Sequence, residues 1–419
     1  MKDTYLTKEK AAEIAARYPT PLHIYNEKGI RDNAKELHKA FSWNKGFKEY
    51  FAVKATPNPA ILKLLKDEGC GVDCSSYTEL MMAERLGFEG EEIMFSSNET
   101  AAEEYVYAKK LGAIINLDDI THIEYLNRHA GIPQKICLRY NPGGEFKIDN
   151  AVMGTPAEAK YGLTRKQMTQ AVKELMRLGC KEFGIHAFLA SNTTGESYYP
   201  ALAQIVFRTI AELTAETGAK FVLANLSGGI GVPYRPEQKK ADIFKIAKGV
   251  EQAYLKELTE KGIEGIKIFT ELGRYMLAPY GVLLTEVIHF KHTYKEYIGV
   301  DACAAHLMRP AIYGAYHHIT VLGKENQPNT EMYDVVGSLC ENSDKFAVNR
   351  PLPKVERGDL LAIHDAGAHG HAMGYNYNGK LRSAEVLLKE DGSFDLIRRA
   401  ETPADYFATL DIFDEFKVF

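Results

Sequence analysis

The chain has 419 residues, more than a single hydrophobic core usually serves, so we expect two domains. Hydrophobic residues make up 45% and charged residues 26%, which is typical of a globular protein. The net charge of −5 gives no support for a nucleic-acid partner or a membrane-surface partner. The first ten residues, MKDTYLTKEK, are polar, and no apolar run approaches the ~18 residues that span a bilayer. We therefore expect a soluble, cytoplasmic protein.

The cysteines and histidines give no sign of a disulfide framework or a metal site. Six cysteines are scattered along the chain without a C-x-x-C pair: Cys70, Cys74, Cys137, Cys180, Cys303 and Cys340. Such spacing indicates reduced thiols. His364, His369 and His371 lie close in sequence, but further ligands are not evident, so we interpret them as a polar cluster and expect no metal.

Short apolar runs alternate with amphipathic stretches between residues 48 and 270. The predicted strands are Glu49–Val53, Gly71–Cys74, Ile93–Phe95, Ala113–Asn116, Lys135–Tyr140, Glu182–His186, Phe221–Leu226 and Ile266–Thr270. The predicted helices between them are Pro59–Glu68, Tyr77–Leu86, Ala101–Lys110, Ile120–His129, Arg165–Arg177, Tyr199–Thr217 and Asp242–Lys261. Regular alternation predicts a parallel sheet, and eight units in about 220 residues favour a closed (β/α)8 barrel.

The pattern changes after Tyr280. Predicted strands there cover residues 281–290, 295–301, 316–322, 332–337 and 359–365, with turn-forming pairs such as Pro-Asn and Asp-Gly nearby. The run Pro21–Tyr25 could add a strand to this second, mostly β domain. We place the barrel domain at residues 28–280 and the β-rich domain at residues 1–27 plus 281–419.

Chemistry in a (β/α)8 barrel lies at the carboxyl ends of the strands. The residues that end or follow the predicted strands are Lys54, Asp73, Arg139, Asn141, His186, Phe188, Ser227, Gly228, Gly229, Glu271 and Arg274. The barrel interpretation therefore brings all of them to one mouth.

Lys54 ends an apolar run in the segment YFAVKATPN. A lysine is costly to bury as a cation, so a desolvated lysine becomes a neutral nucleophile. Such an amine can form a Schiff base with an aldehyde, most often pyridoxal 5'-phosphate. On spacing alone, a lysine that caps a strand end is the more common explanation.

Two further segments suit an anionic aromatic cofactor. Asn225–Gly231 reads NLSGGIG, and its glycines let backbone N–H groups approach a phosphate. In TELGR, residues 270–274, Glu271 can keep a pyridine nitrogen protonated and Arg274 can hold a phosphate or carboxylate. Taken singly, the first segment is equally typical of a tight turn and the second of a surface ion pair.

The ordered motifs resemble those of the fold-type III pyridoxal-phosphate-dependent decarboxylases, and most closely the diaminopimelate decarboxylases, from about residue 20 to 410. The motifs are YFAVKATPNPAIL, GCGVDCSSYTEL, AKYG, NLSGGIG, ELGRYMLAPYG, DACAAHLMRPAIYGAYH, GSLCENSDKF and DAGAHGHAMGYNYNGKLRSAEVLL. The resemblance implies an alanine-racemase-like (β/α)8 barrel followed by a C-terminal, mostly β barrel domain. It also implies a homodimer whose shared active sites lie at the subunit interface.

The resemblance further implies roles for individual residues. Lys54 would be the Schiff-base lysine, Glu271 would pair with the pyridine nitrogen, and Asp73 and Arg139 would support the cofactor. Ser191, Gly228, Gly229 and Tyr377 would surround the phosphate. Arg274, Arg309 and Tyr313 match positions that hold the far carboxylate of the substrate. Cys340 and Glu341 match a pair that enters from the partner subunit, with the cysteine as the proton donor.

Arg309 bears on the choice of substrate. An arginine would repel the distal ammonium of ornithine or lysine, whereas it can bind the distal carboxylate of a diaminodicarboxylate. Glu341 would then meet the distal amine. This reasoning favours decarboxylation of meso-diaminopimelate to L-lysine and carbon dioxide. The alternatives are a decarboxylase of L- or D-ornithine, lysine or arginine in polyamine synthesis, and a non-catalytic cofactor-binding homologue.

The chain departs from the family pattern at several positions. Phe188 stands where the family's stacking histidine is usual, and it can stack on a cofactor but cannot donate a proton. We expect His186, two residues earlier, to point the other way. His369 replaces a usual tyrosine, Tyr375 replaces a small residue, and Ser227 begins the turn where the family has glycine. These departures leave a related amino acid open as substrate.

Overall fold

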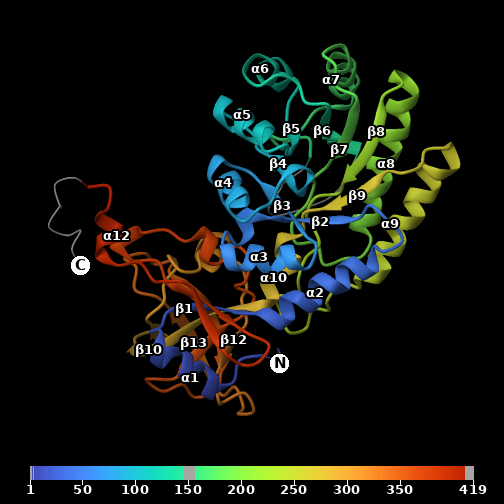
Figure 1. Ribbon diagram of the computed structural model, residues 1–419. Helices are drawn as coiled ribbons and strands as arrows, with labels where there is room; N and C mark the ends of the chain where they lie inside the picture. The colour runs from blue at the N-terminus through green and yellow to red at the C-terminus, as the bar shows by residue number, and fades with distance from the viewer. Residues whose placement is uncertain (1, 3, 146–155, 411–419) are drawn as a thin grey trace. The chain divides into compact units, whose positions relative to one another are not determined.

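The computed structural model describes residue 2, residues 4–145 and residues 156–410 (Figure 1). The ends of the expected domains, at residues 1, 3 and 411–419, and residues 146–155 of the expected barrel lie outside this described part. The chain divides into two compact units. The barrel unit comprises Arg31–Val232 and Lys240–Met276, and the sheet unit comprises Met1–Ile30, Pro233–Lys239 and Leu277–Phe419.

Eight parallel strands close the barrel in chain order. They are β2 (Lys48–Ala52), β3 (Gly71–Cys74), β4 (Ile93–Ser96), β5 (Ile114–Leu117), β6 (Lys135–Arg139), β7 (Glu182–His186), β8 (Lys220–Asn225) and β9 (Lys267–Thr270). The closing pair aligns Lys48 with Phe269 and Glu49 with Thr270. The predicted (β/α)8 barrel is therefore confirmed, and each predicted strand differs from the observed one by at most a residue at either end.

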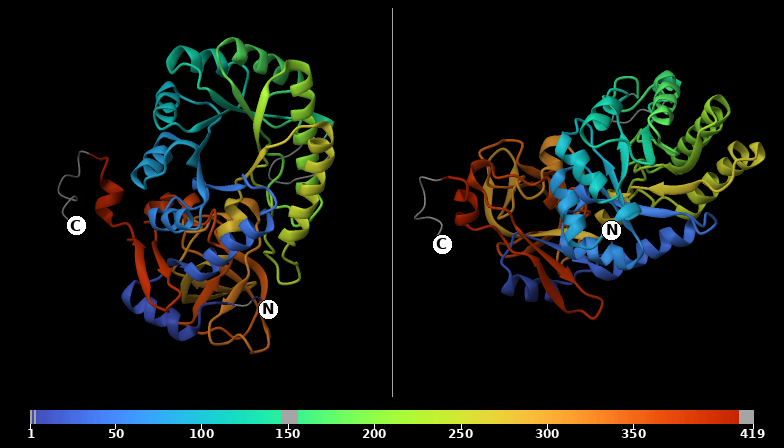
Figure 2. Two further views of the ribbon diagram at one scale, coloured as in Figure 1. Left: turned by 45° about the vertical axis from the view of Figure 1, so that its right-hand side comes forward. Right: turned by 45° about the horizontal axis from the view of Figure 1, so that its top comes forward.

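Helices surround this ring of strands (Figure 2). They are α2 (Glu27–Ala40), α3 (Pro59–Asp67), α4 (Tyr77–Arg85), α5 (Ala102–Lys110), α6 (His122–His129), α7 (Arg165–Arg177), α8 (Tyr198–Thr217), α9 (Ile243–Glu257) and α10 (Gly273–Leu277). Side-chain caps fix several starts; for example, Asn58 accepts from the backbone N–H of Ala60, and Ser76 from that of Glu79. No helix among the described residues is long and apolar enough to cross a bilayer.

The interior of the barrel is packed rather than open. Apolar side chains from six of its strands form one buried cluster: Tyr50, Met94, Ile114, Cys137, Leu223 and Phe269. Because the interior is filled, we expect the active site at the carboxyl ends of the strands.

The sheet unit is built on one nine-stranded sheet. Its strands are β1 (Leu22–Asn26), β10 (Gly281–His292), β11 (Glu296–Val300), β12 (Ile319–Val321), β13 (Glu331–Val336), β14 (Lys345–Leu352), β15 (Leu360–Ile363), β16 (Ala384–Leu388) and β17 (Phe394–Arg398). The main path runs β14-β13-β11-β10-β1-β16-β17, while β15 pairs with β10 and β12. The predicted N-terminal strand does join this sheet, because β1 pairs with β10 and β16. Helices α1 (Lys8–Arg17), α11 (Arg309–Tyr313) and α12 (Pro403–Phe407) complete the unit.

Candidate active site

Lys54 lies in a short 3-10 turn, Val53–Ala55, that follows β2 directly. Val53 and Ala55 are buried, whereas Lys54 is exposed. The expectation of a desolvated lysine is therefore wrong, because the turn buries only the neighbours of Lys54. Burial is the largest influence on the pKa of Asp73 and Glu271, and the positive charge of Lys54 opposes it at both carboxyls. Lys54 thus acts electrostatically on both Asp73 and Glu271.

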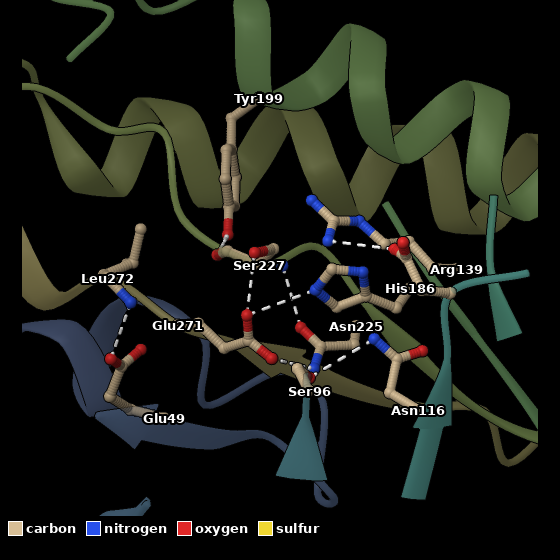
Figure 3. A network of polar contacts seen from close by, with 11 residues as sticks. Glu49, Ser96, Asn116, Arg139, His186, Tyr199, Asn225, Ser227, Glu271 and Leu272 are labelled. Atoms are coloured by element: carbon tan, nitrogen blue, oxygen red, sulfur yellow. Dashed lines mark hydrogen bonds and ion pairs between the residues drawn. The ribbon is translucent and has the colours of Figure 1, made fainter. Parts of the chain in front are cut away.

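Glu271 follows β9 and is held by side chains from the two preceding strand ends (Figure 3). Nδ2 of Asn225 donates to its Oε1 at 2.7 Å, and Oγ of Ser227 donates to its Oε2 at 2.8 Å. Nε2 of His186 lies 3.2 Å from the same Oε2. Burial raises the pKa of Glu271, but the contacts with His186, Ser227 and Lys54 outweigh it and lower the pKa to about 2. Glu271 is therefore an anion in a buried, polar setting.

His186 does not point away from the site, so that expectation is wrong. It is the last residue of β7, is 2% exposed, and contacts Glu271. Side chains two residues apart on a strand lie on the same face, which places the ring of His186 on the side where that of Phe188 was expected. Asn225 was not predicted as a partner of Glu271. It is the last residue of β8, so the rule that barrel chemistry lies at strand ends could have identified it.

Asp73 lies near the carboxyl end of β3, and Arg139 is the last residue of β6. Asp73 is 2% exposed and, within the described chain, its Oδ1 has no hydrogen-bond partner. Burial, followed by the charge of Glu271, holds the pKa of Asp73 well above its ordinary value. Nη1 of Arg139 donates to Oδ1 of Asp118 at 3.2 Å, an acid that sequence reasoning missed. The Arg139 guanidinium also lies 5.9 Å from the ring centroid of Phe188.

Two glycines of the glycine-rich turn, Gly228 and Gly229, have no room for a side chain. A Cβ added at Gly228 would lie 2.9 Å from the carbonyl oxygen of Glu271. Gly229 has φ of +125°, and its Cβ would lie 2.7 Å from the ring of Tyr198. The segment after Ser191 is tied to this turn, since the N–H of Thr193 donates to the carbonyl of Gly229 at 2.8 Å. The segment that follows Ser191 is therefore held against the turn by a backbone hydrogen bond.

In the sheet unit, the Cys340-Glu341 loop contacts the turn that holds Tyr377. The N–H of Cys340 donates to Oδ1 of Asn378 at 2.8 Å, and the hydroxyl of Tyr377 donates to Oε1 of Glu341 at 3.2 Å. This second bond raises the pKa of Tyr377. Cys340 and Tyr377 are both exposed. The sheet unit therefore presents these three predicted site residues together on its surface.

Arg309 is the first residue of α11 and is held on two sides. Its Nε donates to Nε2 of His317 at 3.4 Å, and its guanidinium lies 5.2 Å from the ring centroid of Tyr234. His317 is fully buried, and its Nδ1 lies 2.7 Å from the carbonyl oxygen of His364. Tyr313, at the other end of α11, is 59% exposed. Arg274 is half-buried in the first turn of α10, within the barrel unit.

The comparisons with known proteins define the class. Residues 27–278 match the family model of the pyridoxal-dependent decarboxylases, pyridoxal binding domain. Because this match covers more than half of the chain, the chain belongs to the pyridoxal-dependent decarboxylases. It is accordingly a carboxy-lyase with pyridoxal 5'-phosphate as its cofactor, as the resemblance implied.

Individual relatives refine this picture. The chain is 42% identical over 395 residues to Protein TabA of Pseudomonas amygdali pv. tabaci, covering 94% of this chain and 92% of that protein. It is 34% identical over 397 residues to the diaminopimelate decarboxylase of Methanothermobacter thermautotrophicus, with the same coverage. Among solved structures, diaminopimelate decarboxylase from M. jannaschii in complex with L-lysine matches with a TM-score of 0.89 and 31% identity over 97% of both chains.

The residues of the barrel mouth fit this cofactor. Glu271 is an anion suited to a protonated pyridine nitrogen, and Asp73 has a buried oxygen that lacks a partner among the described residues. The turn at Gly228 and Gly229 leaves room for backbone N–H groups to approach a phosphate. Lys54 is the exposed amine at the same mouth.

Proposed function

We propose that this protein decarboxylates meso-diaminopimelate to L-lysine and carbon dioxide, as a step of lysine biosynthesis. The observation that carries the proposal is the likeness, along 97% of both chains, to a diaminopimelate decarboxylase whose structure was solved with L-lysine. Relatives with the same name are 30–34% identical to this chain over nearly its full length.

Within this proposal, the barrel residues hold the cofactor. When bound, pyridoxal phosphate supplies an electron sink for the bond that breaks as carbon dioxide leaves. Lys54 supplies the amine that attaches it, and the Glu271 carboxylate keeps the ring nitrogen protonated. Asp73, Arg139 and Phe188 support the ring. Ser191, Gly228, Gly229, Arg274 and Tyr377 bind the phosphate.

The remaining residues act on the substrate. Arg274, Arg309 and Tyr313 bind the distal carboxylate, Tyr377 contributes to the same surface, and Glu341 binds the distal amine. Cys340 donates a proton from Sγ to the α-carbon once carbon dioxide has left. The support for Arg309 is its fixed position, since His317 and Tyr234 hold its guanidinium from two sides.

We further propose a homodimer in which Cys340 and Glu341 act in the active site of the partner subunit. Their exposure supports this assignment, because groups that serve another chain must reach the surface. The proposed β-rich domain, residues 1–27 plus 281–419, carries them, and the barrel of residues 28–280 carries Lys54. All six cysteines are free, which supports a location in the reducing cytoplasm.

A second candidate is the decarboxylation of a related amino acid. It is favoured by the greater similarity to Protein TabA, at 42% identity, than to the diaminopimelate decarboxylase of M. thermautotrophicus, at 34%. The departures from the family pattern at Phe188 and Ser227 also bear on the choice of substrate. Phe188 lies near Gly228 of the glycine-rich turn, and Ser227 contacts Glu271.

The experiment that tests the proposal is the incubation of cofactor-loaded protein with meso-diaminopimelate, with carbon dioxide and lysine both quantified. Equal amounts of the two products support the proposed reaction, and no release overturns it. Lys54→Ala is the control: it should abolish the visible absorption of the bound cofactor and the release of carbon dioxide. A variant that keeps both would overturn the assignment of Lys54.

A further inference from the structure

Glu49 lies at the seam where the barrel closes. It is the second residue of β2 and aligns with Thr270 in the pairing of β2 with β9. Its side chain is fully buried. The backbone N–H of Leu272 donates to its Oε1 at 2.7 Å (Figure 3). The hydroxyl of Thr270 donates to its Oε2. The side chain therefore extends the contact between the two strands beyond the end of their ladder.

The two donors flank Glu271 directly. Glu49 thus holds the side chain of Thr270 before Glu271 and the backbone of Leu272 after it, while the N–H of Glu271 itself donates to the carbonyl of Ser227 at 2.9 Å. We propose that Glu49 is a positioning residue for Glu271, which fixes the direction of the Glu271 carboxylate by holding the residues on both of its sides. This inference rests on the role proposed for Glu271 towards the cofactor nitrogen.

The charge of Glu49 follows from its surroundings. Both groups that donate to it are neutral, and the charge of Glu271, which has the same sign, raises its pKa further. A buried carboxylate without a cation is costly, so the neutral form is favoured. Burial raises the pKa of Glu49 to about 8, against the two hydrogen bonds that lower it. Its other titratable neighbours, Tyr199 and Cys70, are themselves kept neutral by burial, which raises the pKa of both.

Glu49 and Glu271 therefore have different protonation states at neutral pH. Glu49 holds a proton and positions the backbone, whereas Glu271 is ionised and faces the site. Environments that separate the pKa values of neighbouring carboxyls are typical of sites in which each acid has its own task. When Glu49 is protonated, its Oε1 can accept from Leu272 while the O–H on Oε2 donates to the hydroxyl oxygen of Thr270, so this bond then runs in the opposite direction to that of the ionised form.

The test uses three variants of the full-length protein. Glu49→Gln copies the protonated carboxyl, because its amide oxygen can accept from Leu272 and its NH₂ can donate to Thr270. Glu49→Ala removes both contacts. Thr270→Val removes only the contact between the Thr270 hydroxyl and Glu49. It replaces Glu49→Ala in the test if that variant fails to fold. The matched control is Tyr50→Phe, the next residue on β2, which loses a bond from its hydroxyl to the carbonyl of Glu91 at 2.6 Å, away from Glu271.

The first measurement is the affinity of each cofactor-free protein for pyridoxal 5'-phosphate, together with the visible spectrum of the complex. We expect at least about 10-fold weaker binding and a changed spectrum for Glu49→Ala, a smaller loss for Thr270→Val, and recovery of most of the affinity by Glu49→Gln. Tyr50→Phe should lower the melting temperature without changing affinity or spectrum. Wild-type affinity and spectrum in both Glu49→Ala and Thr270→Val would overturn the positioning role.

The second measurement is the melting temperature of the cofactor-free wild type and Glu49→Gln across pH. A folded-state pKa of about 8, above the ordinary value of 4.5, means that between these two pH values the folded wild type keeps a proton that the unfolded chain has lost. Wild-type stability should fall relative to Glu49→Gln from about pH 4.5 to about pH 8 and stay constant above that. Parallel curves at every pH would show that Glu49 is not held neutral. Neither measurement uses a substrate, so a wrong substrate assignment would leave both results unchanged.

Discussion

The hydroxyl of Ser227 donates to Oε2 of Glu271 at 2.8 Å from a backbone with φ of +53°. That conformation favours glycine, which is the residue the family pattern has at this position. The chain therefore accepts a strained backbone and gains a hydrogen bond to the anionic carboxylate of its proposed cofactor site. The departure from the family pattern at Ser227 thus adds to the network around Glu271 rather than weakening it.

Two substitutions at Ser227 separate these effects. Ser227→Ala loses the hydrogen bond and keeps the strain, so we expect a loss of about 2 kcal/mol in the free energy of unfolding. Ser227→Gly also loses the bond but relieves the strain, so it should be more stable than the alanine variant by about 1 kcal/mol. Urea unfolding of the cofactor-free proteins measures both. A glycine variant less stable than the alanine variant would contradict this explanation.

The ionisation of Glu271 should appear in the acid stability of the protein. Its folded-state pKa of about 2 lies below the ordinary value of 4.5, so its contribution to stability is present above pH 4.5 and is lost as the pH falls towards 2. Relative to Glu271→Gln, the wild type should lose stability over this range, on the order of 3 kcal/mol in total. Unfolding free energies at pH 5.5, 4.5 and 3.5 check the slope. A constant difference between the two proteins would mean that Glu271 is not an anion in the folded state.

Removal of the Cys340 thiol should affect turnover far more than cofactor binding. Loss of a positioned proton donor typically costs about 100-fold or more in rate, so we expect a fall of that size in kcat for Cys340→Ala. The affinity for pyridoxal 5'-phosphate should stay as in the wild type, because Cys340 lies outside the barrel unit. Cys180→Ala, in the barrel unit, is the matched thiol control. An unchanged kcat for Cys340→Ala would show that the proton comes from another group.

Arg309 should matter for dicarboxylates in particular. Loss of charge-assisted hydrogen bonds in Arg309→Ala should raise the KM for meso-diaminopimelate roughly 10- to 100-fold. Binding of L-lysine, which lacks the distal carboxylate, should weaken much less. Arg309→Lys keeps the charge without the planar guanidinium. Its KM for meso-diaminopimelate should lie between those of the wild type and Arg309→Ala. An equal loss for both amino acids would contradict the proposed clamp.

The barrel could be predicted because its signals are local. Each strand is a short apolar run, each helix has a clear polar and apolar face, and the two alternate regularly. Helix α2 was overlooked because its sequence is rich in charge, although Ile30, Ala34 and Leu37 recur at helical spacing and are buried. Strand β14 is not among the predicted strands, because it contains Pro351; it lies at the edge of its sheet, where proline is tolerated.

Only two signals in the sequence predicted the site: the position of residues at strand ends and the resemblance to a known family. These signals brought Asp73, Arg139 and Glu271 to one mouth, but they gave no partner for Glu271. The contacts of His186, Asn225 and Ser227 with it depend on strand register, which no local pattern encodes. The outward position of Lys54 likewise depends on a turn of three residues that only the folded backbone defines.

The most direct test of the central claim is the ratio of kcat/KM for meso-diaminopimelate to that for other amino acids. Carbon dioxide release by the cofactor-loaded protein should be measured with meso-diaminopimelate, L- and D-lysine, L- and D-ornithine, and L- and D-arginine. The account predicts release from meso-diaminopimelate with little from any monocarboxylate. Preferential release from a monocarboxylate would contradict it and would show that Arg309 does not set the specificity.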